Sequence, residues 1–247
     1  MSEPVENTKK GLLTMNESKP TAYGVGVGPG EPELMTLKAI RLIRENQVIA
    51  VPGKNPKESA AYKIAVQNVP ELADKELVPM SLPMVRDREL LKKAHQKCAE
   101  TVESYLDQGR NVVYITLGDP TVYSTFSYIQ HHLEADGYSV ALVSGVPSFC
   151  AAAARLNVPL AEWDEPLHII PAVHTEENPL QNDGNYVLMK SAGRMKEVKE
   201  FLKQSHPSVY AVENCGMENE MCCYSAEEIP DNAGYFSLII AKGNSHA

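Results

Sequence analysis

The chain has 247 residues, of which 43% are hydrophobic and 22% are charged, and its formal net charge is -9 at pH 7. This composition is typical of a folded protein with one large or two modest cores, and it excludes extensive disorder. The negative charge also argues against binding to nucleic acid through phosphate contacts, because that mode needs an excess of Lys and Arg.

The chain shows no sign of secretion or of a membrane span. Its five cysteines are an odd number without CxxC spacing, which predicts reduced thiols in a cytoplasmic protein. Residues 1–20 are polar and lack the apolar segment of a secretory signal, so we interpret them as a flexible tail. The uncharged stretch 137–154 is interrupted by Ser144, Gly145 and Pro147, which predicts a strand, a loop and the start of a helix.

Residues 21–145 alternate short β-rich runs with longer amphipathic segments, the pattern of βα units around a mostly parallel sheet. A helix is predicted from Pro32, with Leu34, Leu37, Ile40 and Ile43 on one face. The other predicted elements of this part are strands at 23–27, 47–51, 112–117 and 140–143, and helices at 58–68, 88–107 and 122–135.

The second part, residues 146–247, has fewer helices per strand, which predicts a mixed or antiparallel sheet. Its predicted elements are strands at 167–170, 186–189, 209–212 and 236–241 and one helix at 195–203. The sequence therefore predicts an α/β protein with two α/β domains, residues 21–145 and 146–247.

A glycine-rich turn, YGVGVGPGEP at 23–32, lies between the first predicted strand and the first predicted helix. Glycine in such a turn permits a tight bend and close approach of the backbone to a ligand. A dinucleotide site would also need an acidic residue after the second strand, but that strand ends Val51-Pro52-Gly53-Lys54, which argues against a nicotinamide dehydrogenase. A purely structural turn is the alternative.

A second candidate loop, GDPTVYST at 118–125, follows a buried strand. Loops at the carboxyl ends of parallel strands are where α/β proteins place ligands. Asp119 could accept hydrogen bonds from a ligand, and Gly118 would let a backbone amide reach it. The alternative is a Gly-Asp-Pro turn that caps the next helix.

Together with SGVPSF at 144–149, these two loops resemble the three signature segments of the tetrapyrrole methylase superfamily, in the same order and at similar spacing. The resemblance extends from about Thr21 to Lys242. Within the superfamily, GVGVGPGEPELMTLKAIRLI, SLPMVRD at 81–87, GDPTVYSTFSYI and SGVPSFCAAAARL are similar to the precorrin-2 C20-methyltransferases of cobalamin synthesis.

The resemblance implies two α/β domains with S-adenosylmethionine in the cleft between them, and a homodimer. The family's cofactor-binding positions correspond to Pro29, Gly118, Asp119, Val122, Pro147, Ser148, Met189, Asn214, Cys215 and Ala241. Met189 and Ala241 can also be interpreted as core residues. Sibling enzymes often have Pro-Gly-Ile-Thr or Pro-Gly-Val-Ser where this chain has Ser144-Gly-Val-Pro147, so the contacts of Pro147 and Ser148 are the least transferable.

The implied substrate, precorrin-2 or its cobalt complex, carries many carboxylates, so its site should offer Arg, Lys or backbone donors. Arg86 is the first candidate, Tyr123 and Lys190 are further ones, and Lys54 and Arg194 follow. Exposed charges, and simple packing of Tyr123, are the alternatives. The seven histidines form no HxH or HExxH motif, so no metal held by the protein is predicted.

Three other activities compete with this hypothesis. They are a sibling methylase such as a uroporphyrinogen-III C-methyltransferase, a methylase of ribosomal RNA or diphthamide, and a protein that binds S-adenosylmethionine without turnover. The sequence identifies neither the group that accepts the proton from the methylated carbon nor the metal state of the substrate.

Overall fold

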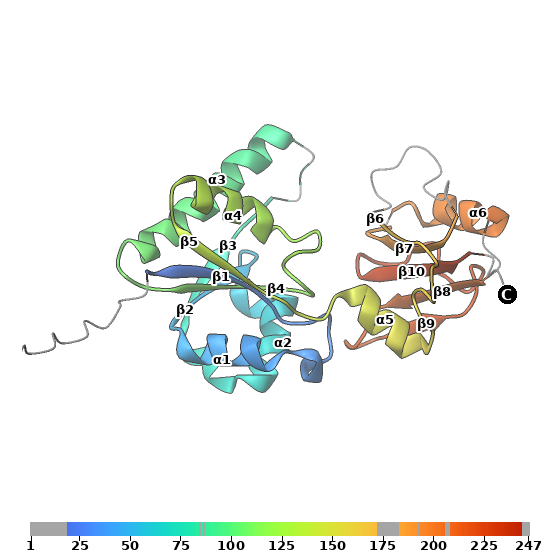
Figure 1. Cartoon of the computed structure of the whole chain (residues 1–247), viewed down its shortest axis with the longest axis horizontal. Helices are drawn as coiled ribbons and strands as arrows, with labels where there is room; N and C mark the ends of the chain where they lie inside the picture. The colour runs from blue at the N-terminus through green and yellow to red at the C-terminus, as the bar shows by residue number, and fades with distance from the viewer. Residues whose placement is uncertain are drawn as a thin grey trace, which may run out of the picture.

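The computed structural model describes residues 19–83, 85, 87–171, 183–191, 193–205 and 208–243. The described residues form two five-stranded sheets, and the chain completes the first before it starts the second (Figure 1). The strands are β1 Thr21–Gly26, β2 Val48–Pro52, β3 Glu76–Met80, β4 Val112–Thr116, β5 Ser139–Val143, β6 Leu167–Pro171, β7 Asn185–Met189, β8 Ser208–Glu213, β9 Met221–Cys223 and β10 Ser237–Lys242. The helices are α1 Leu37–Glu45, α2 Ala60–Asn68, α3 Arg88–Leu106, α4 Phe126–Ala135, α5 Ser148–Leu156 and α6 Met195–Ser205, with 3-10 helices η1 Pro32–Leu34, η2 Pro56–Glu58 and η3 Pro70–Asp74.

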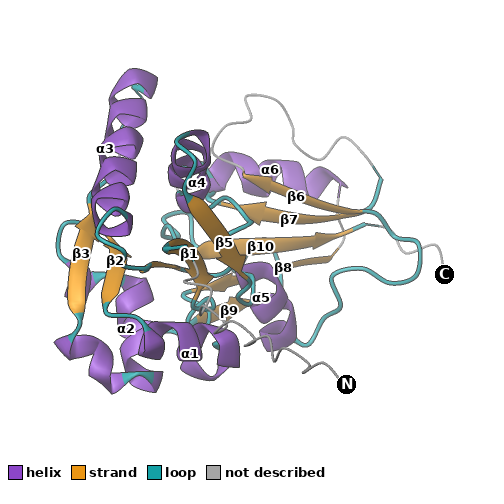
Figure 2. Ribbon diagram, turned by 60° about the vertical axis from the view of Figure 1, so that its left-hand side comes forward, coloured by secondary structure: helices purple, strands orange, loops and turns teal. Residues whose placement is uncertain are grey.

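The first sheet has the strand order β3-β2-β4-β1-β5, and all its pairs are parallel. Helices α1 and α2 cover one face and α3 and α4 the other (Figures 1 and 2). The central strand β4 is buried throughout, with Val113 and Ile115 in the core next to α1 and α2, and Val112 and Tyr114 in the core next to α3 and α4. Because the strands run in one direction, the loops after β1, β4 and β5 meet at one edge.

The second sheet has the order β6-β7-β10-β8-β9, in which only β6 and β7 pair in parallel. Alternate residues of its strands face opposite sides, as a strand requires. Leu188 and Ile239 pack in the core with α6, whereas Val187 and Ile240 pack in the core with α5. The mixed sheet predicted for this part of the chain is confirmed.

The helix predicted from Pro32 is divided in the structure. Pro32 begins η1, and α1 starts only after Thr36, whose Oγ accepts a hydrogen bond from the Ala39 amide at 3.2 Å. Leu37 is 86% exposed, so its predicted place on the buried face was wrong. Because Thr36 is the N-cap, Leu37 is the first residue of α1. The residues that α1 buries are Ala39, Leu42 and Ile43.

One helix start and two strands also differ from the sequence prediction. The helix predicted from Val122 starts at Phe126, because Tyr123 has a left-handed φ of 48° that interrupts the helix. The short edge strands β3 and β9 were not predicted. β3 contains Pro79, which lacks an amide hydrogen and is tolerated at a sheet edge. None of the helices in the described ranges combines the length and apolar character needed to cross a bilayer.

A candidate active site between the two sheets

A cavity of about 390 Å³ lies where the carboxyl edge of the first sheet meets the second sheet. Its walls come from the loops after β1, β4, β5 and β8, from the ends of β2 and β7, and from the starts of α2 and β10. The volume falls in the range of about 300–1,000 Å³ that small-molecule sites occupy. Both halves of the chain are therefore needed to enclose one small ligand.

Asp119, directly after β4, holds two of these loops together. Its Oδ1 accepts hydrogen bonds from the amide of Thr121 at 2.7 Å and from the Thr121 hydroxyl at 2.5 Å. Its Oδ2 accepts a hydrogen bond from the amide of Gly145, in the loop after β5, at 3.0 Å. A carboxylate has about four acceptor positions. Three are used here, so Asp119 chiefly positions the loops and retains capacity for one further donor.

The loops after β1 and β4 are joined by their backbones. The Gly28 amide donates to the Gly118 carbonyl at 3.3 Å, and the Gly118 amide donates to the Gly28 carbonyl at 2.8 Å. A Cβ at Gly26 or at Gly145 would lie 2.4 or 2.1 Å from the Gly118 carbonyl oxygen. The close packing of these loops therefore depends on missing side chains, and it presents bare backbone to the cavity.

The second sheet contributes side chains. Leu238 at the start of β10 pairs with Met189 at the end of β7, and Ser237 pairs with Glu213 at the end of β8. This antiparallel register brings the ends of two strands and the start of a third to one edge, so that residues far apart in sequence line the same wall. The lining residues of this wall are Met189, Lys190, Cys215, Met217, Tyr235, Phe236, Ser237 and Leu238.

Three buried side chains with hydroxyl groups, Tyr114, Thr116 and Ser124, line the cavity on the side of the first sheet. The Tyr114 hydroxyl is buried and has no hydrogen-bond partner among the described residues, and its burial raises its pKa, so that it stays protonated. The hydroxyls of Thr116 and Ser124 lie 3.2 Å apart. A buried polar group without a partner is unfavourable. The wall thus offers polar groups to a ligand from an otherwise largely apolar surface.

Lys190 directly follows β7, and its Nζ lies 5.7 Å from the centre of the Tyr123 ring. Burial lowers the pKa of this lysine. Tyr123 and Lys190 both have left-handed backbones, with φ of 48° and 56°, and the Tyr123 hydroxyl donates to the Ile169 carbonyl at 2.9 Å. Strained residues of this kind are concentrated at functional sites. Among the described residues that line the cavity, Lys190 is the single lysine or arginine.

Cys215 also lines the cavity, but its chemistry is passive. Burial, followed by the nearby Glu220 carboxylate, raises the pKa of its thiol to about 11. The thiol is therefore protonated at neutral pH and is a weak nucleophile. Within the described ranges, no three His, Cys, Asp or Glu side chains converge as ligands for a metal ion.

Most of the predicted cofactor-binding residues meet in the cavity wall: Pro29, Gly118, Asp119, Val122, Pro147, Ser148, Met189 and Cys215. Asn214 precedes Cys215 in a left-handed backbone and donates its side-chain amide to the Asn219 carbonyl at 3.4 Å. Ala241 is fully buried in the core with α6, on the opposite face of the sheet from Leu238. Neither Asn214 nor Ala241 is a lining residue.

The predicted substrate-binding residues divide in the same way. Tyr123 and Lys190 line the cavity. Arg86 lies outside the described residues. Lys54 is exposed, and Arg194 forms an ion pair with Glu197 at 2.5 Å just before α6, so neither belongs to the cavity wall.

Sequence reasoning missed two parts of the wall. One is the start of α2 at residues 59–61, which carries no distinctive motif. The other is the segment 235–238, where two aromatic residues follow a glycine before an apolar strand. These two neighbouring aromatic residues were the feature that could have indicated a site in the sequence. However, only the pairing of β10 with β7 and β8 brings the segment to the cavity.

Residues 21–226 match the model of the tetrapyrrole (corrin/porphyrin) methylases. The chain is 39% identical to a probable cobalt-precorrin-2 C(20)-methyltransferase of Methanocaldococcus jannaschii, over 72% of this chain and 75% of the relative. It is 28% identical to a precorrin-2 C(20)-methyltransferase of Sinorhizobium sp, over 89% of this chain and 94% of the relative.

A solved structure shows the same fold. It is the uroporphyrin-III C-methyltransferase of Thermus thermophilus in complex with S-adenosylhomocysteine, which aligns with a TM-score of 0.67 at 22% identity. The alignment covers 90% of this chain and 97% of that one. The overall fold of this chain is therefore shared with that structure.

Proposed function

Because this chain belongs to the tetrapyrrole (corrin/porphyrin) methylases and is a methyltransferase of that family, we propose that it methylates C20 of precorrin-2 or of its cobalt complex in cobalamin biosynthesis. Two relatives that carry this activity in their names align with most of the chain. The observation that carries the proposal is the cavity at the meeting point of the three signature loops.

S-adenosylmethionine is the proposed methyl donor, and the cavity fits a molecule of its kind. The volume suits one small ligand, the loops after β1 and β4 offer bare backbone, and the buried Tyr114 hydroxyl has no hydrogen-bond partner among the described residues. The residues proposed to hold it are Pro29, Gly118, Asp119, Val122, Pro147, Ser148, Met189, Asn214, Cys215 and Ala241.

The chain's own contribution to methyl transfer is positioning and exclusion of water. A displacement at the methyl carbon needs the attacking carbon to be held in line with the leaving sulfur, and an electron-rich tetrapyrrole supplies that carbon itself. The loops are locked by Asp119 and by the Gly28 and Gly118 backbones, and they would hold the donor in a fixed position. The protonated Cys215 thiol is consistent with a reaction that forms no covalent intermediate on the enzyme.

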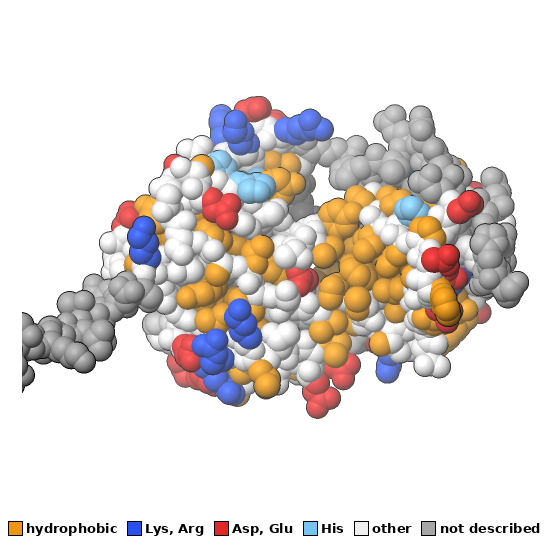
Figure 3. Space-filling model, viewed as in Figure 1, with side chains coloured by type: hydrophobic (Ala, Val, Ile, Leu, Met, Phe, Trp, Pro, Cys, Tyr) orange, Lys and Arg blue, Asp and Glu red, His pale blue; other side chains and the backbone are white. Residues whose placement is uncertain are grey.

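We further propose that residues 21–145 and 146–247 form two domains and that the enzyme is a cytoplasmic homodimer. Hydrophobic side chains gather over the part of the surface built from the second sheet (Figure 3). Exposed large apolar side chains in the second half of the chain include Trp163 and Leu167. Apolar surface of this kind supports association. Light scattering of the purified protein should give twice the mass of the chain, and a monomer at micromolar concentration would contradict the dimer.

The activity is tested by an anaerobic reaction with S-adenosylmethionine and either precorrin-2 or cobalt-precorrin-2, followed by mass spectrometry and NMR. We expect one added methyl group, located at C20, and the preferred substrate will identify the metal state. Absence of methylation with both substrates, while S-adenosylhomocysteine still binds, would contradict the proposal. It would indicate a sibling substrate such as uroporphyrinogen-III, or a protein that binds the cofactor without turnover.

A further inference from the structure

Three aromatic side chains surround the mouth of the cavity. Tyr235 and Phe236 come from the segment before β10, and Tyr123 comes from the loop after β4. Their exposed fractions are 52%, 40% and 47%, whereas Tyr114, Thr116 and Ser124 deeper in the wall are buried. Large exposed aromatic rings at the rim of a cavity are unfavourable in water unless a ligand covers them.

Each ring is held in a defined orientation. The Tyr235 and Phe236 rings pack edge to face with centroids 5.4 Å apart. The Phe236 carbonyl accepts a hydrogen bond from the Asn214 amide at 3.3 Å. The hydroxyl of Tyr123 donates a hydrogen bond to the carbonyl of Ile169 at 2.9 Å, which fixes the orientation of that ring. The rim is therefore preorganised, and binding a flat ligand would not have to order it.

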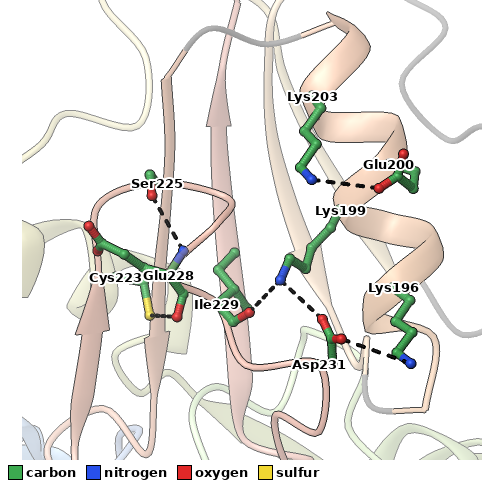
Figure 4. Close-up of polar contacts among 9 residues, drawn as sticks. All are labelled: Lys196, Lys199, Glu200, Lys203, Cys223, Ser225, Glu228, Ile229 and Asp231. Carbon is green, nitrogen blue, oxygen red and sulfur yellow. Dashed lines mark hydrogen bonds and ion pairs between the residues drawn. The ribbon is translucent and has the colours of Figure 1, made fainter.

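The segment that carries Tyr235 and Phe236 is also anchored from behind. Figure 4 shows Lys199 of α6 reaching the carbonyl of Ile229 at 2.8 Å and the carboxylate of Asp231 at 3.0 Å. The side chains of Ala226, Ile229 and Ala233 are buried in the core with α6. Closer to the rim, the Gly234 amide donates to Glu213 at 2.7 Å. Residues 224–236 thus form an anchored segment, and its last two residues line the cavity.

The size of the cavity indicates which ligand the rim serves. A volume of about 390 Å³ is near the low end of the range for small-molecule sites. A tetrapyrrole with its acetate and propionate arms is much larger than the methyl donor, and a cavity of this size suits the donor alone. The tetrapyrrole would then lie across the mouth. Lys190 stands at that mouth beside Tyr123 and, within the described residues, forms no ion pair. A carboxylate of the ligand would complement its charge.

We propose that Tyr123, Tyr235 and Phe236 are the surface on which the ring of the tetrapyrrole stacks, and that Lys190 binds one of its carboxylates. This inference rests on the proposed function. It assigns the buried part of the cavity to the methyl donor and the aromatic rim to the methyl acceptor. Tyr235 and Phe236 thereby become specificity-determining residues for the second substrate.

The test is an anaerobic titration of precorrin-2, followed by its absorbance, into enzyme saturated with S-adenosylhomocysteine. The double variant Tyr235→Leu/Phe236→Leu keeps apolar surface but removes both rings. It should weaken precorrin-2 binding by about tenfold or more, and Lys190→Gln should weaken it by about fivefold. In separate calorimetric titrations, the affinity for S-adenosylhomocysteine should change less than about twofold in both variants.

The matched control is Tyr224→Leu. Tyr224 is 58% exposed in the same segment and packs edge to face against Tyr210, and neither ring lines the cavity, so its loss should leave both affinities unchanged. Weaker S-adenosylhomocysteine binding by the double variant, with precorrin-2 binding intact, would assign the rim to the methyl donor and overturn the inference. Failure of the wild-type enzyme to bind precorrin-2 would instead contradict the proposed function.

Discussion

The two sheets serve the same cavity by different means. The parallel first sheet brings three loop ends together and presents glycine backbone, whose conformation Asp119 and the Gly28 and Gly118 hydrogen bonds fix. The mixed second sheet brings strand ends and a strand start together and presents side chains such as Lys190 and Phe236. Substitutions in the tightly packed glycine loops of the first sheet should therefore disturb the whole site. A side chain of the second sheet can be replaced without moving its neighbours.

If this contrast is correct, Gly145→Ala should be the most damaging single change. The added Cβ would lie 2.1 Å from the Gly118 carbonyl oxygen and 2.9 Å from the backbone of Gly26, so the loops would have to separate. We expect a loss of about 3 kcal/mol in the free energy of unfolding, measured by urea denaturation, together with loss of S-adenosylhomocysteine binding.

Gly109→Ala is the control for that experiment. Its Cβ would meet nothing within 4 Å, but its φ is +76°, so the variant measures backbone strain alone. The expected loss is about 1 kcal/mol, without an effect on ligand binding. Equal losses in the two variants would show that close packing of the three loops is unimportant.

Asp119→Ala should have the next largest effect. The change leaves the buried amide of Gly145 without its acceptor and releases Thr121. We expect a loss of about 2 kcal/mol in the free energy of unfolding and, because the loops then move apart, about tenfold weaker binding of S-adenosylhomocysteine by calorimetry. Asp74→Ala, at an exposed position in η3, is the comparison variant. Unchanged ligand affinity in a folded Asp119 variant would refute the role of this loop.

The difference between the loops of the first sheet and the side chains of the second sheet also explains which parts of the site could be predicted from the sequence. Gly28, Gly118 and Asp119 lie in short local motifs between a strand and a helix, so their position at the carboxyl edge follows from chain order alone. Tyr235 and Phe236 reach the cavity only through the pairing of β10 with β7 and β8. Such register is set by contacts between distant segments, which a single sequence does not reveal.

Ala241 illustrates how the face of a strand on which a residue lies is missed from the sequence. Side chains alternate along β10, so Leu238 and Ile240 face α5 while Ile239 and Ala241 face α6. A shift of one residue changes the face, and position in the strand alone does not tell which residues face the cavity. The predicted cofactor contact of Ala241 remains a prediction, and its side chain lies in the core.

Lys199→Met should produce a smaller effect that belongs to the second sheet. The variant removes the ties to the Ile229 carbonyl and to Asp231 that anchor residues 224–236 on α6 (Figure 4). We expect a loss of about 1 kcal/mol in urea denaturation and a higher KM for the tetrapyrrole. The KM for S-adenosylmethionine should be unchanged, and Lys199→Arg should restore most of the loss.

Lys203→Met is the matched control on the same helix. Lys203 pairs with Glu200 at 3.6 Å on the exposed surface, and such pairs contribute little to stability. Its removal should leave both the unfolding midpoint and the two KM values at wild-type values. If Lys199→Met behaves like Lys203→Met, residues 224–236 hold their place through apolar contacts alone.

The smallest expected effect is a difference in acid sensitivity. The hydrogen bond from Lys199 lowers the pKa of Asp231 in the folded protein. A carboxyl group with a lowered folded pKa contributes stability above its unfolded pKa of about 3.9, and it loses that contribution as the pH falls through the folded value. Below about pH 4, the wild type should therefore lose slightly more stability than Lys199→Met, so the difference between their urea midpoints narrows. A difference that stays constant in acid would show that Lys199 acts through the Ile229 carbonyl and not through Asp231.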